Sequence, residues 1–416
     1  MKVSVFTPTH NPEFLLRARD SLVRQTYRDF EWIVMPNHGA IIDEPTIGEG
    51  IPELKVFSGE GLSGIGMLKN SAANLCSGEI LVELDHDDEL TPNALQRLAE
   101  EFTKDKCLDF VYSNSCCIDE NNVTGHYSMM YGWKYLPFTN DRLQTVSFKP
   151  SPASFGKIWY APDHVRAWRS KFYQMIGGHD KTLPLLDDHD LVCRTYIHGK
   201  VKHIDECLYV YHIGNNTYSQ KWENDYIQKG TLKIYDKYIE QMVKRWCEDK
   251  GLMQVTLKGD GMDREGTHIY GIRDHGRWPF EDNSVGVFHA NQALPYFENP
   301  IHAMEEIYRC LTPNGWLLST TPSTDGRGAF MNPNYKSRWN ANSFLYYTNM
   351  NFSKHIGTPV KFQCFSMNKK YYPEEWYEQA ECPFVSADLI KLPQHRIPGH
   401  VEFPRTQDEM LTEPED

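Results

Sequence analysis

The sequence lacks any hydrophobic run close to the roughly twenty residues that cross a bilayer, so we expect no transmembrane segment. It also lacks a CxxC pair among its ten cysteines, and the adjacent Cys116 and Cys117 are unlike a disulfide framework. The amino terminus has the pattern of a strand rather than of a signal peptide. These absences predict a protein of the reducing cytoplasm. The sequence also lacks an excess of basic residues, because its formal net charge is −13. This charge argues against nucleic-acid binding through a broad basic surface.

What the sequence does contain is typical of a globular protein. Its 416 residues, 40% of them hydrophobic, are enough for two domains with sizeable cores. The most informative segment is residues 78–88, where an apolar strand leads directly into Asp85, Asp87 and Asp88. Carboxylates at the carboxyl end of a buried strand lie where open α/β sheets bind ligands, and this spacing of oxygen atoms suits Mg²⁺ or Mn²⁺. The alternative is an acidic turn that caps the next helix, since Thr91-Pro92 resembles a helix start.

Three further segments support the first interpretation. Residues 3–11 predict a strand that turns into a helix with apolar residues at helical spacing. Residues 30–35 predict a second strand, and Pro36-Asn37-His38-Gly39 predicts the turn at its end. Residues 64–74 predict a glycine-led helix that carries Lys69-Asn70. Strand ends, a lysine and a carboxylate pair therefore converge on one crevice, as binding of a nucleotide diphosphate with its metal requires.

In this order the motifs resemble the GT-A glycosyltransferases of glycosyltransferase family 2, over about the first half of the chain. Pro8-Thr9-His10-Asn11 is similar to that family's first nucleotide-binding loop, Lys69-Asn70 to its basic helix, and Asp85-His86-Asp87 to its DxD motif. The resemblance implies a GT-A nucleotide-diphospho-sugar transferase fold, an α/β domain with a mixed, mainly parallel sheet.

The resemblance also implies roles for individual residues. Thr9 and Asn37 would approach the base, Lys69 the nucleotide or its phosphates, and Asp85 and Asp87 the ribose and the metal. One departure concerns the base, because Pro36-Asn37 stands where the family usually has two aspartates, and an amide cannot offer two acceptors as a carboxylate does. The expected donor-binding residues are Pro8, Thr9, His10, Asn11, Asn37, Lys69, Asn70, Asp85 and His86.

A second acidic group, Asp187-Asp188, lies where the family has its Glu-Asp motif. A transfer that inverts the anomeric centre needs a base within hydrogen-bond reach of the acceptor hydroxyl, and the resemblance assigns this role to Asp188, with Asp187 beside it. The alternative is that both acids only begin a helix, where negative charge is favourable. By the same resemblance His212 is the nearest match to a third metal ligand, although the family more often has its histidine at the position of Gly214. The basic and aromatic residues 157–171 are expected to border the acceptor site.

The sequence changes character near Gly251. Residues 278–322 predict a strand, a helix, a proline-asparagine-glycine turn and a strand, and they resemble the second half of class I S-adenosylmethionine-dependent methyltransferases. That family's glycine-rich cofactor loop is missing, and Gly259-Asp260-Gly261 is a weak substitute. We therefore expect a truncated and inactive methyltransferase-like domain of the α/β class, for which S-adenosylmethionine is an unlikely cofactor. An active methyltransferase is the alternative.

The expected organisation is a glycosyltransferase domain at 1–220, a connecting helix at 221–251, the methyltransferase-like domain at 252–400 and an acidic, disordered tail at 401–416. The expected activity is metal-dependent transfer, of the hexosyltransferase type, from a nucleotide diphosphate sugar, most commonly a UDP-sugar in this family, to an acceptor hydroxyl. Mn²⁺ or Mg²⁺ would bind at Asp87, Asp85 and His212.

The acceptor stays open between a glycan, a protein and a hydroxylated nucleobase, and an oligomer formed through the C-terminal domain is a further expectation. A nucleotidyltransferase is disfavoured, because Thr7-Pro-Thr-His-Asn11 is not a glycine-rich phosphate loop. A non-catalytic protein that binds nucleotide sugars or glycans remains a second alternative.

Overall fold

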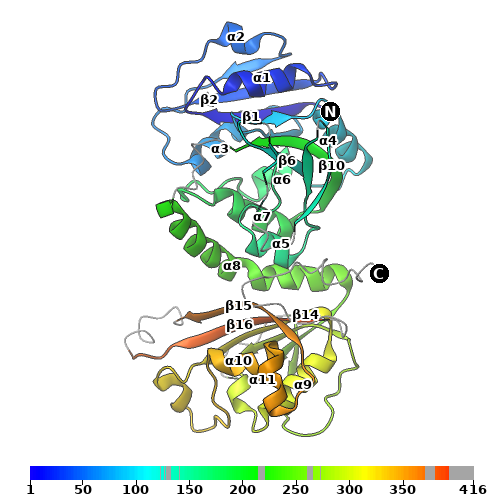
Figure 1. Cartoon of the computed structure of the whole chain (residues 1–416), viewed down its shortest axis with the longest axis vertical. Helices are drawn as coiled ribbons and strands as arrows, with labels where there is room; N and C mark the ends of the chain where they lie inside the picture. Colours follow the sequence, from blue (N-terminus) through cyan, green and yellow to red (C-terminus); the bar gives the residue numbers. More distant parts are fainter. Residues whose placement is uncertain are drawn as a thin grey trace. The chain divides into compact units, whose positions relative to one another are not determined.

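The computed structural model describes residues 1–121, 123–125, 127, 133–139, 141–213, 221–259, 266–271, 273–370 and 380–392. The chain forms two compact units, Met1–Met242 and Val243–Asp416 (Figure 1). The boundaries expected from the sequence at 220, 251 and 400 stay predictions. Gly214, Asp260, Gly261 and the acidic tail lie outside the described residues. Within the described part of the chain, no helix has both the length and the apolar character to cross a membrane.

The first unit contains a ten-stranded mixed sheet. Its main path runs in the order β3-β2-β1-β4-β9-β6-β10-β5, and β7 and β8 extend from β6. The strands are β1 Val3–Thr9, β2 Phe30–Pro36, β3 Leu54–Val56, β4 Ile80–Glu83, β5 Glu89–Leu90, β6 Phe110–Ile118, β7 Lys134–Pro137, β8 Leu143–Val146, β9 Arg166–Arg169 and β10 Val201–His212. The helices are α1 Leu15–Val23, α2 Glu44–Gly48, α3 Ile65–Asn74, α4 Ala94–Lys104, α5 Pro152–Lys157, α6 Ser170–Met175 and α7 Asp187–His198, and α8 Lys221–Lys250 continues beyond the boundary of this unit.

The period-two alternation of side chains places this sheet between two apolar layers. Val3 and Val5 of β1 pack into one core with α1 and α4, whereas Phe6 faces the other core with α3 and α7. All seven residues of β1 are buried, as expected for a central strand covered on both faces.

Strand direction determines where the polar loops gather. β1 is parallel to both β2 and β4, so Thr9 and Pro36 lie opposite each other in register, and Phe6 lies opposite Glu83. The loops that follow these three strands therefore emerge at the same edge of the sheet. β9 is antiparallel between β4 and β6, so residues just before its start, including His164, reach that edge too.

The second unit contains a six-stranded sheet in the order β12-β11-β13-β14-β16-β15. The strands are β11 Met253–Leu257, β12 His268–Tyr270, β13 Val285–Asn291, β14 Leu311–Pro322, β15 Phe362–Lys370 and β16 Phe384–Lys391. The first four strands of this order are parallel, and β16 and β15 are antiparallel to their neighbours. The helical elements are η2 Leu294–Tyr296, α9 Pro300–Cys310, η3 Arg327–Phe330, α10 Ala341–Thr348 and α11 Met350–Ile356.

The strand-helix-turn-strand prediction for residues 278–322 is realised by β13, α9 and β14. The predicted turn at Pro313-Asn314-Gly315 is not a separate loop, because β14 already begins at Leu311. The turn instead forms an irregularity inside the strand: the register with β13 shifts between Leu311 and Trp316, and Asn314 has a φ of 65°.

Candidate active site

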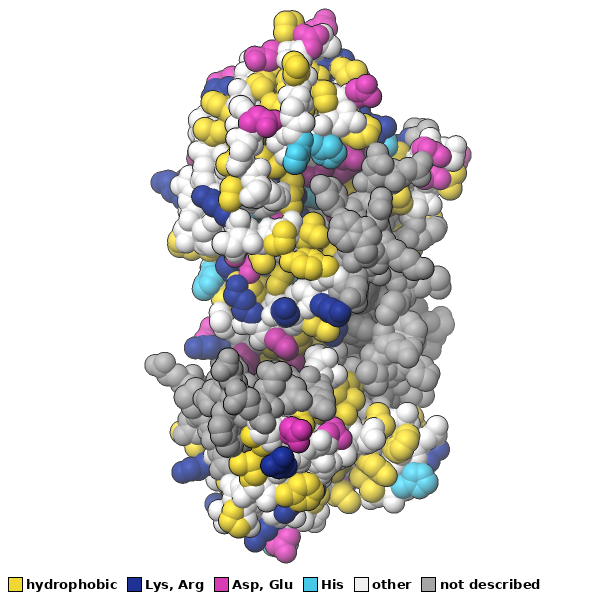
Figure 2. Space-filling view, turned by 90° about the vertical axis from the view of Figure 1, so that its left-hand side faces the viewer, with side chains coloured by type: hydrophobic (Ala, Val, Ile, Leu, Met, Phe, Trp, Pro, Cys, Tyr) yellow, Lys and Arg dark blue, Asp and Glu magenta, His cyan; other side chains and the backbone are white. Residues whose placement is uncertain are grey.

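The acidic turn after β4 is held against the loop after β1. The Thr9 hydroxyl lies 2.7 Å from His86 Nδ1, and the rings of His10 and His86 are 4.9 Å apart. Asp85 and Asp87 keep 31% and 35% of their side chains exposed, so a ligand can reach both carboxylates. Figure 2 shows histidine side chains beside recessed acidic ones on this unit.

The other residues expected to bind the donor differ in their burial and in their hydrogen bonds. Pro8 is a buried residue of β1 rather than of a loop, whereas His10 is exposed. Asn37 is 6% exposed, and its backbone N–H donates to the Thr9 carbonyl at 2.9 Å. The carboxamide oxygen of Asn11 accepts from the backbone N–H of Glu13 at 3.1 Å, which fixes the turn into α1.

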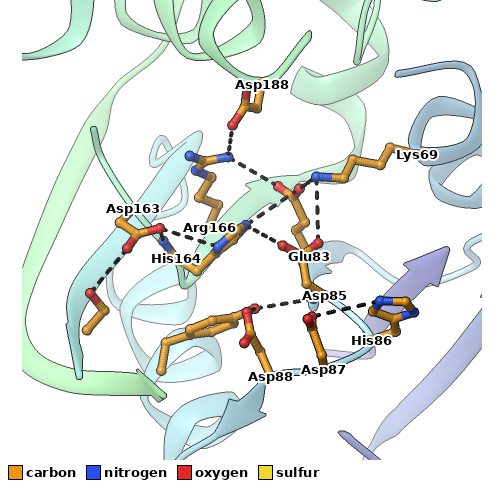
Figure 3. A network of polar contacts seen from close by, with 12 residues as sticks. Lys69, Glu83, Asp85, His86, Asp87, Asp88, Asp163, His164, Arg166 and Asp188 are labelled. Atoms are coloured by element: carbon orange, nitrogen blue, oxygen red, sulfur yellow. Dashed lines mark hydrogen bonds and ion pairs between the residues drawn. The ribbon is translucent and has the colours of Figure 1, made fainter. Parts of the chain in front are cut away.

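Lys69 and Asn70 are adjacent on α3 but face different partners. The Lys69 ammonium contacts the Glu83 carboxylate and lies 3.7 Å from Asp85 Oδ1 (Figure 3). The Asn70 amide nitrogen instead donates to the carbonyls of Gly177 and His179, at 3.0 and 2.8 Å. Asn70 therefore fastens α3 to the loop before α7, and Lys69 alone is directed at the acids.

The start of α3 lies directly against the start of α7. A Cβ atom at Gly66 would come within 2.8 Å of the Asp187 Cβ and would be even closer to the Asp180 carbonyl oxygen. Only glycine permits this approach without displacement of one of the two helices.

The two acids at the start of α7 have different environments. Asp188 Oδ2 accepts from the Arg166 guanidinium at 3.0 Å, and 21% of its side chain is exposed. Burial alone would raise the pKa of Asp188, but Arg166 and then Lys69 lower it below its usual range. Asp187 is 3% exposed, and its Oδ2 has no hydrogen-bond partner. Burial raises the pKa of Asp187 to about 7, and the negative charge of Asp188 adds to the effect, against the opposing charge of Lys69.

Glu83, the last residue of β4, is the centre of this site and was missed by the sequence analysis. Its carboxylate is fully buried and contacts four basic side chains, three of which Figure 3 labels. These are Lys69, His164, Arg166 and His179. Burial would raise the pKa of Glu83, but Lys69 and His164 together hold it well below its usual range. A glutamate inside an otherwise apolar strand was the available signal, since an acid is almost never fully buried without partners.

His164 and Arg166 come from residues 157–171, the segment expected to border the acceptor site. His164 Nε2 lies 3.6 Å from Glu83 Oε1 and 3.8 Å from Asp85 Oδ2, and its Nδ1 lies 3.4 Å from Asp163 Oδ1. Burial opposes protonation of His164, but the surrounding carboxylates, first Asp85, raise its pKa to about 10. The place of this segment relative to an acceptor stays a prediction.

His212 lies at the end of β10 and has other partners. Its Nε2 is 2.9 Å from Glu89 Oε1, and its backbone N–H donates to Asp88 Oδ1 at 2.8 Å. The second oxygen of Asp88 accepts from the Tyr209 hydroxyl at 2.8 Å. Asp88 therefore ties the acidic turn to β10 and is not available to a ligand.

Two regions of the chain match sequence models of known families. Residues 4–165 match glycosyl transferase family 2, and residues 263–319 match a methyltransferase domain. The chain is 26% identical to the chondroitin synthase of Escherichia coli over 249 residues, which cover 58% of this chain and 33% of that protein. It is 26% identical to the hyaluronan synthase of Pasteurella multocida over 227 residues, which cover 53% of this chain and 21% of that protein. The chain thus spans about a fifth to a third of the length of these relatives.

A structural comparison finds the crystal structure of S. aureus TarS 1-349 in complex with UDP-GlcNAc, with a TM-score of 0.42 and 16% identity, covering 58% of this chain and 72% of that chain. The family matches confirm the resemblances noted in the sequence. The match to glycosyl transferase family 2 lies in the first unit, and the match to the methyltransferase domain lies in the second. The fold class is confirmed as well: a GT-A domain with a mixed α/β sheet, followed by a smaller α/β domain.

Proposed function

We propose that the first unit is an inverting, metal-dependent glycosyltransferase that moves a sugar from a nucleotide diphosphate sugar to an acceptor hydroxyl. One observation carries this proposal. Within and beside the region matched to family 2, Lys69 and Asp85 are linked through the buried Glu83 and Arg166 to Asp188. A cationic group for a leaving diphosphate and a carboxylate base thus belong to one connected site.

On the donor side, Lys69 would stabilise the negative charge that develops on the diphosphate as the glycosidic bond breaks. Its ammonium is buried and held by Glu83, so it is positioned before the donor binds. Thr9 and Asn37, at the ends of β1 and β2, would approach the base, and a UDP-sugar is the first donor to test. We propose that the donor side also includes Pro8, His10, Asn11, Asn70 and His86.

The site has the chemistry to hold a divalent cation such as Mn²⁺ or Mg²⁺. The exposed oxygens of Asp85 and Asp87 are suitable hard ligands, and a Glu83 carboxylate oxygen lies near Asp85. A bound cation would supply positive charge to the leaving diphosphate.

On the acceptor side, exposure favours Asp188 over Asp187 as the base. A general base must reach the acceptor hydroxyl, and the Asp188 side chain is 21% exposed whereas that of Asp187 is 4% exposed. The lowered pKa of Asp188 keeps it ionised at neutral pH, ready to take the hydroxyl proton as the oxygen attacks the anomeric carbon. Asp187, with a pKa of about 7, would hold a shared proton behind it.

Two alternatives keep their own tests. The match of residues 263–319 to a methyltransferase domain leaves methyl transfer by the second unit as an alternative activity, and we propose that this unit is an inactive relative of that family. A protein that binds nucleotide sugars or glycans without turnover is the other alternative. Methylation of candidate acceptors with labelled S-adenosylmethionine tests the first, and calorimetry with bare nucleotides tests the second.

The deciding experiment is release of nucleotide diphosphate from a panel of nucleotide sugars, UDP-GlcNAc among them, in the presence of Mn²⁺. Release with one donor, abolished by Asp188→Asn and by Asp87→Ala, would support the proposal. Asp105→Asn is the matched control, because Asp105 pairs with Lys200 at the far end of α4. Release that persists in Asp188→Asn would remove Asp188 as the base. Nucleotide binding without release from any donor, with or without added acceptors, would favour the binding protein.

A further inference from the structure

Three side chains below the acidic turn have the arrangement of an ion site. One donor atom each from Glu83, Asp85 and His164 lies within 4.8 Å of the other two. His164 Nε2 is 3.6 Å from Glu83 Oε1 and 3.8 Å from Asp85 Oδ2, which is too long for hydrogen bonds. Ligands that share one ion at bond lengths of about 2.0–2.2 Å are themselves about 3–4 Å apart, so these separations suit a shared cation.

Two of these side chains have buried polar atoms without hydrogen-bond partners. Neither ring nitrogen of His164 has a hydrogen-bond partner, and only 7% of its side chain is exposed. Glu83 Oε2 also lacks a partner, and the Glu83 side chain has zero exposure. Buried polar atoms are nearly always bonded, so such exceptions require an explanation. A cation between the imidazole and the carboxylates would satisfy His164 Nε2, whereas Glu83 Oε2 faces Arg166 and His179.

The surroundings of the His164 ring are those of a metal ligand. Its Nδ1 faces Asp163 Oδ1 at 3.4 Å, while Nε2 points at Glu83 and Asp85 (Figure 3). A carboxylate behind the second nitrogen of a histidine commonly fixes the ring of a metal ligand. The ring also stacks on Tyr209, with centroids 4.8 Å apart and planes 26° apart, which further defines its orientation.

The charge balance of the site leaves room for a divalent cation. The connected contacts include two permanent cations, Lys69 and Arg166, and His164 adds a third positive charge only while its ring is protonated. Against them stand more carboxyl groups, namely Glu83, Asp85, Asp163, Asp187 and Asp188. The two oxygens of Asp85 face different partners, Oδ1 toward Lys69 and Oδ2 toward His164, so one carboxylate can serve both the lysine and an ion.

We propose that His164, with Asp85 and Glu83, binds the divalent cation of the first unit, and that His212 does not. The histidine ligand then comes from the residues just before β9 rather than from the end of β10, where His212 Nε2 is engaged with Glu89 at 2.9 Å. The use of the ion in sugar transfer rests on the proposed function, but its binding does not. An imidazole with two carboxylates suits Mn²⁺.

The test is binding of Mn²⁺ alone, without nucleotide, to chelator-treated protein, followed by electron paramagnetic resonance and calorimetry. We expect one Mn²⁺ per chain, a loss of affinity of about ten- to a hundredfold in His164→Gln, and less than about twofold in His212→Gln. Weakening by His212→Gln with no effect of His164→Gln, equal effects of both, or no Mn²⁺ binding by the unaltered chain would each overturn the proposal.

A second measurement does not depend on folding of the His164 variant. Electron spin echo modulation of the Mn²⁺ complex detects coupling to a histidine nitrogen, and this coupling should persist in His212→Gln. Its loss in that variant, or its absence from the unaltered protein, would contradict the assignment. Failure of the proposed function can be distinguished from failure of this assignment. If Mn²⁺ binds at His164 but no donor releases nucleotide diphosphate, the metal site is supported and only the proposed activity is rejected.

Discussion

Arg166 Nη1 lies 3.0 Å from Asp188 Oδ2 and, on the other side, 3.8 Å from Glu83 Oε2. One buried guanidinium thus joins the candidate base to the end of the strand that leads into the acidic turn. Because Glu83 also contacts Lys69, the charges proposed for the donor side and for the acceptor side form one network. A substitution of any member is expected to change the electrostatic environment of the others.

Arg166→Gln should reduce turnover most strongly at acid pH. Removal of the guanidinium removes the main influence that lowers the pKa of Asp188, so the base becomes protonated at a higher pH. We expect kcat/KM to fall about a hundredfold at pH 6 and about tenfold at pH 8. A pH-rate profile checks this, with Arg169→Gln as control because the Arg169 guanidinium donates to the backbone carbonyls of Leu108, Phe102 and Asp105. A loss that is equal at all pH values would contradict this role of Arg166.

Asp187→Asn should change how stability depends on pH. The pKa of Asp187 is about 7 in the folded protein against 3.8 as its ordinary value, so the folded state holds the proton more tightly. The carboxyl therefore favours folding most below about pH 4, and this advantage is lost as the pH rises through 7. Relative to the variant, the unaltered protein should lose at most about 4 kcal/mol of unfolding free energy between pH 4 and pH 8. Urea unfolding across this range measures the difference, and a constant difference would refute the shift.

Glu31→Gln should destabilise the first unit at neutral pH. The Glu31 side chain is fully buried and accepts hydrogen bonds from Lys55 at 2.7 Å, Lys2 at 3.2 Å, Ser4 and Ser77. Burial opposes ionisation, but these partners lower the pKa of Glu31 to about 2. The stabilisation is present above about pH 4.5 and is lost as the pH falls through 2, so we expect a cost of about 3 kcal/mol at pH 7 that shrinks at pH 3.

The matched control for Glu31 is Glu53→Gln. Glu53 pairs with the same two lysines, Lys2 and Lys55, but 42% of its side chain is exposed. Solvent screens such pairs, so the control should cost less than about 1 kcal/mol in urea unfolding at pH 7. Equal costs for the two variants would show that burial is not the deciding factor.

Lys69→Gln should weaken binding of a nucleoside diphosphate more than that of a monophosphate. The ammonium lies beside the Asp85 carboxylate, where the diphosphate is proposed to bind, and a monophosphate offers it less charge. We expect calorimetry to show an affinity for UDP lower by about tenfold or more, and a smaller change for UMP. The variant leaves Glu83 with one cation fewer, so circular dichroism is needed to check that it folds. Lys200→Gln controls for loss of a lysine, because Lys200 is exposed and pairs with Asp105 away from the site. Equal weakening of both nucleotides would place Lys69 away from the second phosphate.

The first strands and the acidic turn could be predicted from the sequence because both depend on local pattern. Strands with apolar periodicity that end in polar residues must bring those ends together if they are parallel, as β1, β2 and β4 do. The surroundings of Glu83 could not be predicted, because His164 and Arg166 reach it through β9, an antiparallel strand inserted between β4 and β6. No local pattern reveals which strand will take that place.

The direction of a side chain on a predicted helix was equally hidden. Lys69 and Asn70 are neighbours in sequence, yet one faces the acids and the other bonds the carbonyls before α7. A step of one residue turns a helix by about 100°, so adjacent residues seldom share a target. The role of His212 shows a similar limit, because its partner Glu89 comes from the short strand β5, which pairs with β10 only in the folded sheet.

The contact at Gly66 offers a way to abolish the proposed activity without altering a single charge. An alanine there adds one methyl group between α3 and α7, against Asp187 and the Asp180 carbonyl. That group would act as a wedge, moving the lysine-bearing helix away from the aspartate-bearing one while every ionisable side chain is kept. The resulting protein would serve as an isoelectric reference, in which geometry alone distinguishes it from the unaltered chain.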